Sequence, residues 1–303
     1  MITTKGTELP ILDLDGFPAI HVPVLQTAAG TPYLREPGVA LLAKPDVSLA
    51  GMQGFLEGYD PNFKFEEYLN DPDILPPAET LLKAAGQTCY ASWGPGRSWN
   101  KDAAKYLDHI KSSGHGSVLE HANFSFLLYG ISRSNSHEGV RHRAGTAFSQ
   151  LSQRYVSGRV LRFVERPSYV ASEKLHARFE RRIDFLAKEY AEISEELYAM
   201  QAAGENAILS ADQKTDLRKK VQQEARSVLP NETETVMVLT GNVRSWRHMI
   251  EMRANGGAEV EIRGTFYRLF HCLKLVAPLL FNDYEIVQQP DGTCVVATPY
   301  RKV

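Results

Sequence analysis

The residues best suited to chemistry lie between Ser134 and Tyr155, in the stretch SNSHEGVRHRAGTAFSQLSQRY. Three of them, Arg141, His142 and Arg143, stand side by side. The wider segment 122–163 contains six arginines, no lysine and a single acidic residue, Glu138. A guanidinium group is a rigid planar fork that can bind two oxygens of a phosphate or carboxylate at once. The pattern therefore predicts that an anionic ligand binds here.

Two further groups of arginines occur later in the chain. Arg226 falls in the last turn of an expected helix that Pro230 ends. In the next expected helix, the helical repeat places four residues on one face: Asn242, Trp246, Ile250 and Arg253. Because Arg253 shares this face with two large apolar residues, we favour a role in a site for it. For Arg247 we expect an ordinary solvent-exposed position.

No side chain is placed as a nucleophile by its sequence neighbours. The three cysteines are far apart, no serine stands in an elbow motif, and the glycine-containing loop at 94–98 is too short to cradle a phosphate. The segment HGSVLEH (115–121) lacks the spacing of a zinc motif, so a locally paired loop or a ligand-facing loop is favoured over a metal site. Many cations without a nucleophile suggest that a bound cofactor performs the difficult step.

The overall composition limits the classes of function. A net charge of -2 and an isoelectric point near 6.5 argue against a protein that coats nucleic acid, so a small anionic ligand is favoured. The N-terminus lacks the pattern of a signal peptide, and no apolar run is long enough for a membrane span. An odd number of widely spaced cysteines is typical of reduced thiols. We therefore expect a cytoplasmic protein that binds neither nucleic acid nor membranes.

These residues need a scaffold of strands and helices to bring them together. The apolar run 123–131 predicts a buried strand, and Ser132 can cap a helix that continues through Arg143. Ser210 and Gln213 form a capping box at the start of another helix. The periodicity predicts the remaining helices at 78–85, 101–113, 175–200, 242–253 and 259–276.

Strands and helices thus interleave along the chain. A short strand is expected at 236–240 and a hairpin around Asp291–Gly292. We predict an α/β (α+β) fold in which long helices flank a mixed sheet. Three segments are expected: an N-terminal extension of short strands and loops at 1–75, a single catalytic domain at 76–281, and a C-terminal tail at 282–303.

Four ordered blocks of sequence resemble the flavin-dependent thymidylate synthases, the ThyX family. They are GHGSVLEH at 114–121, GISRSNSHEGVRHR at 130–143 with its continuation to RY at 154–155, ARSVLP at 225–230 and TGNVRSWRHMIEMRA at 240–254. The three residues RHR alone would be weak evidence. Four blocks in the family order are strong evidence.

The resemblance implies the reductive methylation of dUMP to dTMP. In the family, methylenetetrahydrofolate is the carbon donor, and FAD that NADPH has reduced supplies the hydride. The phosphates of dUMP and FAD and the glutamate tail of folate all suit arginine, and no cysteine nucleophile is needed. The resemblance also implies a homotetramer whose active sites are shared between subunits.

The resemblance assigns roles to individual residues. Arg253 would be catalytic, because a guanidinium can bind the uracil ring and favour its N3-ionised form. Contacts to FAD would come from His115, Ser117, Arg141, His142, Arg143, Gln150, Asn242, Arg244 and His248. Contacts to dUMP would come from Glu138, Arg141, Gln150, Leu151, Ser152, Gln153, Arg154, Arg226 and Arg253. The segment 150–154 would be a phosphate loop supplied by a neighbouring subunit, and no metal is implied.

The chain departs from the family pattern in places. Some members have Gln at the position of Glu138 and Glu at that of Gln150. Many have a histidine where this chain has Asn255-Gly256-Gly257. Two other classes of function remain as alternatives: a nucleotide- or RNA-binding module without turnover, and a structural helical protein with incidental arginines.

Overall fold

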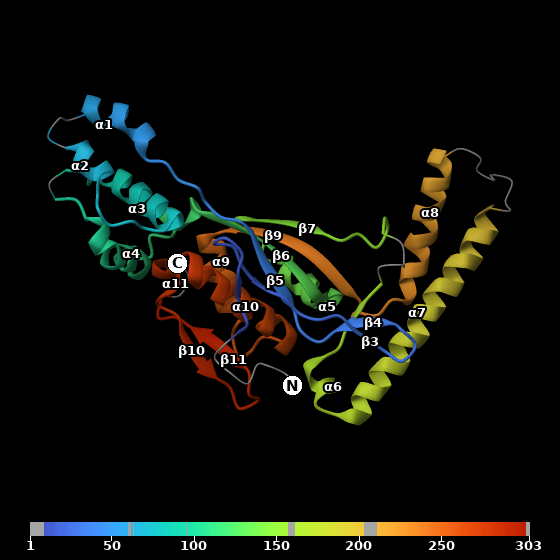
Figure 1. Ribbon diagram of the computed structural model, residues 1–303. Helices are drawn as coiled ribbons and strands as arrows, with labels where there is room; N and C mark the ends of the chain where they lie inside the picture. The colour runs from blue at the N-terminus through green and yellow to red at the C-terminus, as the bar shows by residue number, and fades with distance from the viewer. Residues whose placement is uncertain are drawn as a thin grey trace.

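Figure 1 shows the computed structural model of the chain, which describes residues 9–300 except 60, 61, 63, 95, 157–160 and 203–210. Its centre is a six-stranded sheet in the order β1-β2-β5-β6-β9-β7, with every pair antiparallel. The strands are β1 (Leu12–Asp13), β2 (Pro18–Ile20), β5 (Gly38–Ala43), β6 (Asn123–Ser132), β9 (Glu234–Asn242) and β7 (Thr146–Gln150).

The two central strands carry the apolar alternation that a sheet with one buried face requires. In β6, Phe124, Phe126 and Leu128 are almost fully buried. Two helices, α9 (Val243–Arg253) and α10 (Val260–Val276), contribute Trp246 and Phe266 to the same core cluster. The Trp246 indole also donates to the Phe124 carbonyl oxygen at 3.3 Å, so α9 is fixed against the strand that precedes the arginine stretch.

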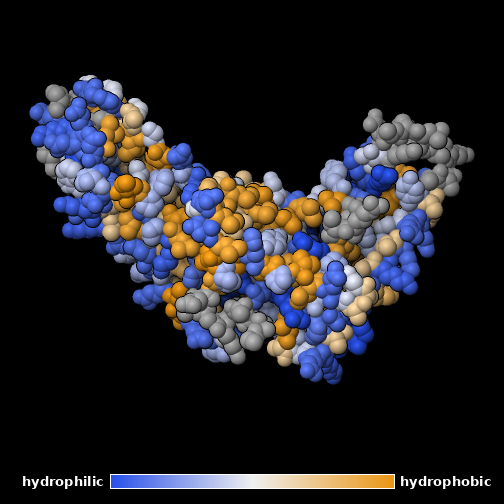
Figure 2. All heavy atoms as spheres, viewed as in Figure 1, coloured by the Kyte–Doolittle hydropathy of each residue, from blue (hydrophilic) through white to orange (hydrophobic). Residues whose placement is uncertain are grey.

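Two helical arms extend from opposite ends of the sheet and produce a V-shaped outline (Figures 1 and 2). One arm contains α1 (Gln53–Tyr59), α2 (Phe65–Leu69), α3 (Pro77–Cys89) and α4 (Ala103–Ser112). The other contains the 30-residue helix α7 (Glu173–Ala202) packed on α8 (Ala211–Ala225). At the base of α7 lies a small sheet of β3 (Leu25–Gln26), β4 (Pro32–Leu34) and β8 (Phe163–Val164).

Short elements complete the described chain. The hairpin of β10 (Glu285–Gln288) and β11 (Cys294–Ala297) turns at Gly292, whose φ of 81° favours glycine. The remaining segments are α5 (Arg133–Gly139), α6 (Pro167–Val170), α11 (Pro278–Phe281) and the 3-10 turns η1 (Ala50–Met52), η3 (Asn100–Asp102), η4 (Gly116–Glu120) and η6 (Arg226–Val228).

The expected α/β class, the strand at 123–131 and the hairpin at Asp291–Gly292 are confirmed. The expected helix cap at Ser132 is also confirmed, because its side chain accepts from the Asn135 amide, and Asn242 caps α9 in the same way by accepting from the Ser245 amide. The pairing type differs from the expected mixed sheet: the one parallel pair among the described strands, β4 with β8, lies in the small sheet. Strands β2 and β5 of the N-terminal segment belong to the central sheet, while the division at residue 75 stays a prediction.

Two helix boundaries differ from expectation. The helix capped by Ser132 ends at Gly139 rather than Arg143, so Arg141, His142 and Arg143 lie in a turn. Helix α3 passes through Gly86 to Cys89, and the glycine leaves room for Tyr106, since an added Cβ would lie 2.6 Å from the Tyr106 hydroxyl. The predicted cap at Ser210 lies outside the described residues.

The prediction that Arg247 is solvent-exposed was wrong. Its side chain is 2% exposed and binds both carboxylate oxygens of Asp283 at 2.8 Å. Lys111, equally buried, donates to Asp283 at 2.9 Å. Burial alone would raise the pKa of Asp283, but hydrogen bonds from Arg247, Thr298 and Lys111 lower it to about 2. This buried cluster holds α4, α9 and the chain after α11 together.

Candidate active site

Arg253, the last residue of α9, is the centre of a hydrogen-bonded group. Its guanidinium donates from Nη1 to Glu138 Oε2 at 2.7 Å, from Nη2 to the Glu138 carbonyl oxygen at 3.1 Å, and from Nε to His142 Nε2 at 2.9 Å. The side chain is 18% exposed and that of Glu138 is 32% exposed, so the pair lies at the surface of the core. The fold thus brings Arg253 into contact with Glu138 and His142, which lie more than a hundred residues earlier in the sequence.

His142 is held as a neutral hydrogen-bond acceptor. Burial, the charge of Arg253 and the neighbouring His248 together lower the pKa of His142 to about 4. Since Nε2 accepts from Arg253, the proton of the neutral ring is on Nδ1. The two histidine rings meet edge to face with centroids 5.4 Å apart. The backbone is fixed as well, because Thr146 Oγ1 donates to the His142 carbonyl oxygen at 2.6 Å.

The turn after His142 is joined tightly to the start of α9. Ser245 Oγ donates to the Ala144 carbonyl oxygen at 2.6 Å, and the Asn242 amide donates to that of Gly145 at 3.2 Å. Gly145 has a φ of 67°, and a Cβ there would lie 2.4 Å from Ser245 Oγ. Only glycine fits this close approach without strain, which explains its place between the RHR turn and β7.

The glycine of the HGSVLEH segment serves a similar purpose. Arg244 lies directly against Gly116, where an added Cβ would be 2.6 Å from its Nε, and its Nη1 donates to Glu120 Oε1 at 2.6 Å. Ser117 is exposed beside this contact. His115 lies next to Tyr90 and His109, with ring centroids 6.2 Å apart in both pairs, and lines a cavity of about 330 Å³. The HGSVLEH segment is therefore adjacent to α9. No group of three or more metal-ligating side chains is found in the described part of the chain.

Cations with free guanidinium groups lie on the exposed side of this region. Arg141 and Arg143 are exposed, and neither side chain forms an ion pair or hydrogen bond with the described residues. Arg244 and His248 are exposed on the same helix, α9. Unpaired arginines around a turn suit a diphosphate, which can accept several charge-assisted hydrogen bonds. The residues present therefore fit a dinucleotide cofactor such as FAD.

A second cationic group lies at the other end of α5. Burial and the nearby charge of Arg226 both lower the pKa of Arg133. Within the described residues neither side chain has an acidic partner, although both are half-buried. Like charges brought together without a counter-ion are stabilised by a bound anion. Arg133 was not assigned a role from the sequence. Its position within the second family block, at 130–143, is the feature of the sequence that could have marked it as a site residue.

The segment 150–154 continues from β7 along the start of β9. Gln150 Nε2 donates to Thr235 Oγ1 at 3.2 Å, and the Leu151 amide donates to the Val236 carbonyl oxygen at 2.8 Å. Leu151 and Ser152 are half-buried, the Gln153 amide nitrogen is buried without a partner among the described residues, and Arg154 is exposed. No hydrogen bond or ion pair between described residues joins this segment to Glu138, His142 or Arg253.

The structure thus brings some of the predicted residues together and leaves others apart. One group, around α9 and the RHR turn, contains Glu138, Arg141, His142, Arg143, Asn242, Arg244, His248 and Arg253, with His115 and Ser117 beside it. A second contains Arg226 with Arg133, and a third is the segment 150–154.

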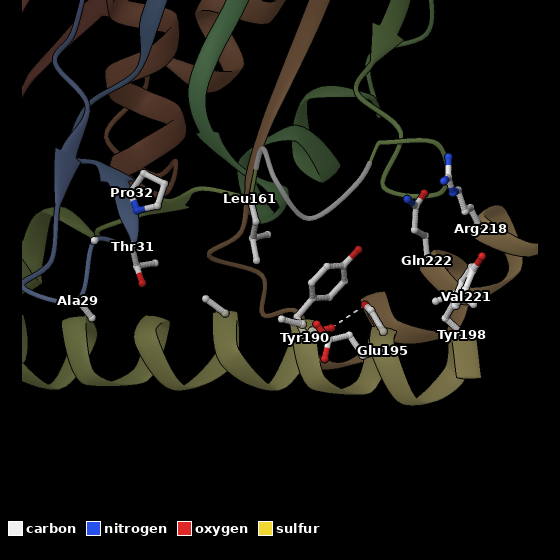
Figure 3. A pocket seen from close by; sticks show the side chains of 14 residues that line it. Ala29, Thr31, Pro32, Leu161, Tyr190, Glu195, Tyr198, Arg218, Val221 and Gln222 are labelled. Carbon is white, nitrogen blue, oxygen red and sulfur yellow. Dashed lines mark hydrogen bonds between the residues drawn. The ribbon is translucent and has the colours of Figure 1, made fainter. Parts of the chain in front are cut away.

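A large cavity lies outside all three groups. It has a volume of about 710 Å³ and is formed by α7, α8 and the turn before β4, with Tyr190, Arg218 and Gln222 in its walls (Figure 3). No predicted site residue lines it. We therefore do not regard it as the active site.

Comparison with known proteins places this geometry in context. A sequence model of a protein family, described as thymidylate synthase complementing protein, matches residues 73–279. The flavin-dependent thymidylate synthase of Mycobacterium tuberculosis (strain H37Rv) is 41% identical over 238 residues, which cover 77% of this chain and 92% of the relative. That of Mycobacterium sp. (strain KMS) is 42% identical over 240 residues with the same coverage.

A solved structure supports the fold. The chain is similar to the UMP/dUMP methylase PolB from Streptomyces cacaoi bound with 5-Br dUMP, with a TM-score of 0.51 and 16% identity. The match covers 82% of this chain and 94% of the other. None of the described helices is long and apolar enough to cross a membrane.

Proposed function

Since the chain belongs to the flavin-dependent thymidylate synthases, we propose that it converts dUMP to dTMP at the group of residues around Arg253. The observation that carries this assignment is the paired arrangement of Arg253 with Glu138 and the neutral His142. The flavin is FAD in this proposal, NADPH is the reductant, and methylenetetrahydrofolate is the carbon donor. The bound flavin supplies the hydride for the reduction.

Arg253 is assigned to the uracil ring. A guanidinium keeps its charge at all physiological pH values, and here it is partly desolvated, so it stabilises negative charge on the ring more strongly than it would in water. In this proposal the uracil ring accepts from the Arg253 N–H groups that donate to Glu138 in the structure. Glu138 is then available to accept from a hydroxyl group of the nucleotide. His142 continues to accept from Nε, which keeps the guanidinium plane oriented.

The phosphate of dUMP is assigned to Arg133 and Arg226. Two half-buried guanidinium groups without acidic partners supply the two charges that a phosphate monoester needs. Arg141 reaches the nucleotide as well. Gln150, Leu151, Ser152, Gln153 and Arg154 complete the phosphate site from a neighbouring subunit.

The flavin is assigned to the exposed side of α9 and the turns beside it. Arg141 and Arg143 bind its diphosphate, and Arg244, held by Gly116 and Glu120, adds a third cation. The other residues of this surface are His115, Ser117, His142, Gln150, Asn242 and His248. The side-chain oxygen of Asn242 already caps α9, so its side-chain NH2 group is the part that donates to the cofactor.

The protein is proposed to act as a homotetramer in the cytoplasm. Helix α7 exposes large apolar side chains, including Phe185 at 59% and Met200 at 71%, which a monomer would leave in water. Figure 2 also shows apolar residues gathered over the sheet between the two arms. All three cysteines are unpaired, which suits a reducing compartment. Light scattering on Phe185→Glu should show smaller assemblies than wild type, and an unchanged mass would refute this surface.

The reaction itself is tested with purified protein, dUMP, methylenetetrahydrofolate and NADPH. We expect flavin absorbance in the protein and formation of dTMP by chromatography. Omission of each co-substrate in turn separates their roles. A protein that binds dUMP and FAD but forms no dTMP would refute the proposal and favour a binding module.

A further inference from the structure

Glu261, the second residue of α10, is a buried carboxylate that binds the start of α5. Its side chain is 3% exposed, and the two helices pack against each other (Figure 1). Oε1 accepts from the Ser132 amide at 2.7 Å and from Asn135 Nδ2 at 3.2 Å, while Oε2 accepts from the Ser132 hydroxyl at 2.8 Å. Three donors from the cap and first turn of one short helix thus converge on a single carboxylate.

Two further side chains complete the hydrogen bonds around this carboxylate. Thr265, one turn further along α10, accepts from the same Asn135 Nδ2 at 2.9 Å. Arg166, at the start of α6, supplies the opposite charge to Glu261 Oε2. Ser132, Asn135 and Thr265 are all at most 4% exposed. A shift of α5 along α10 would leave buried polar groups unpaired, which is costly, so the start of α5 is fixed.

The backbone at the start of α5 is held by the chain that follows Arg226. The Arg133 amide donates to the Thr233 carbonyl oxygen at 2.9 Å, and the Ser134 amide donates to that of Asn231 at 3.3 Å. The side-chain bonds to α10 and these backbone bonds together determine where α5 begins.

Helix α5 carries two residues that are assigned to dUMP, one near each end. Arg133 is its first residue and is assigned to the phosphate, while Glu138 binds Arg253 Nη1 at 2.7 Å and is assigned to a hydroxyl group. Five residues at 1.5 Å each separate the two along the helix axis by about 7.5 Å. A displaced helix would therefore move both contacts together, and small displacements of positioning groups weaken substrate recognition strongly.

We propose that Glu261 is a positioning residue for dUMP, which holds α5 through Ser132 and Asn135 in the place where Arg133 reaches the phosphate. This inference rests on the proposed function, in which the phosphate is assigned to Arg133. Glu261 is too deeply buried to contact the substrate, so it acts through α5. It affects the affinity for the nucleotide, and above all the contribution of the phosphate to that affinity.

The test compares the binding of dUMP with that of deoxyuridine, which lacks the phosphate, by calorimetry on the flavin-loaded protein. Glu261→Gln keeps the size of the side chain but removes its charge and one of its acceptor oxygens. We expect the preference for dUMP over deoxyuridine to fall by about threefold or more, while the flavin content stays unchanged. A general loss of stability affects both ligands alike, so it leaves this preference as it is.

Glu165→Gln is the matched control. Glu165 is also fully buried, and its carboxylate binds Arg35 at 2.8 Å and His176 of α7 at 2.7 Å. Its replacement removes a comparable buried charge at a distance from α5, so the preference for dUMP should equal that of wild type. The same fall in both variants would overturn the positioning role of Glu261.

Arg133→Ala separates this inference from the assignment on which it rests. An unchanged preference for dUMP in Arg133→Ala would overturn the phosphate assignment and this inference with it. A lower preference in Arg133→Ala together with an unchanged one in Glu261→Gln would overturn this inference alone. The double variant should match Arg133→Ala, because Glu261 acts through that guanidinium, and an additive loss would contradict this.

Ser132→Ala keeps the inference testable if Glu261→Gln does not fold. It removes the hydroxyl that joins α5 to Glu261 and leaves the pair of Glu261 with Arg166 in place. The preference for dUMP should fall in this variant as well. An unchanged preference would show that the bonds to Glu261 do not position Arg133.

Discussion

Glu79 gives the stability of this protein an unusual dependence on pH, and Glu79→Gln tests it. The side chain is fully buried on α3, where Oε1 accepts from the Leu279 amide at 2.7 Å and Oε2 has no partner among the described residues. Burial raises the pKa of Glu79 to about 7 from its usual 4.5, and the Leu279 amide and the charge of Lys111 oppose only part of this effect.

The sign follows from the proton balance between the two states. Below about pH 4.5 Glu79 is protonated in both states and contributes nothing. As the pH rises from 4.5 to 7, the unfolded chain loses this proton while the folded protein retains it, so the free energy of unfolding falls. Each pKa unit corresponds to about 1.4 kcal/mol, which gives a loss of about 3 kcal/mol at pH 8.

Glu79→Gln removes the ionisation and keeps an oxygen for the Leu279 amide. We expect the variant to be more stable than wild type by about 3 kcal/mol at pH 8 and by far less at pH 5. The free energy of unfolding should be measured in urea at both values, at one protein concentration, because assembly shifts apparent stability. Glu196→Gln, an exposed position on α7, is the matched control. A stability difference that does not grow between pH 5 and pH 8 would refute the reasoning.

Four further outcomes are expected. Arg253→Ala should lower kcat/KM for dUMP by about a hundredfold or more while the flavin stays bound, because the loss of one charge-stabilising donor has an effect on this scale. Arg178→Ala, at an exposed position, is the control, and loss of flavin from Arg253→Ala would contradict the assignment. Arg133→Ala should weaken dUMP binding about tenfold without changing binding of deoxyuridine, which has no phosphate; an equal loss for both in calorimetry would exclude a phosphate contact. The NMR signals of the His142 ring should remain those of a neutral imidazole from pH 8 down to 5.5, since its pKa is about 4; a transition near pH 6.5 would disprove this. Asp283→Asn should destabilise the protein by about 3–5 kcal/mol in urea unfolding, because Arg247 and Lys111 lose their buried counter-ion.

Some features of the fold could be predicted because their causes are local. The alternation in 123–131, the caps at Ser132 and Asn242 and the Asp-Gly turn depend on residues a few positions apart, so they are visible in the sequence. The helix boundary at Gly139 was harder, because the turn that follows is fixed by Ser245 and Thr146 rather than by its own residues. Long-range contacts decide such boundaries.

The site divides in the same way. The ordered blocks identified the family, and the density of arginine predicted where anions bind, because both depend on residue type and spacing alone. The helical repeat separated Arg253 from Arg247 on the same helix, but it wrongly placed Arg247 in solvent. One meets Asp283 in the core, and the other meets Glu138 and His142 at its edge. Only the packing of α9 between the RHR turn and the chain after α11 decides that Arg247 is buried against Asp283 while Arg253 stays at the edge of the core, since burial and partner are properties of the folded chain.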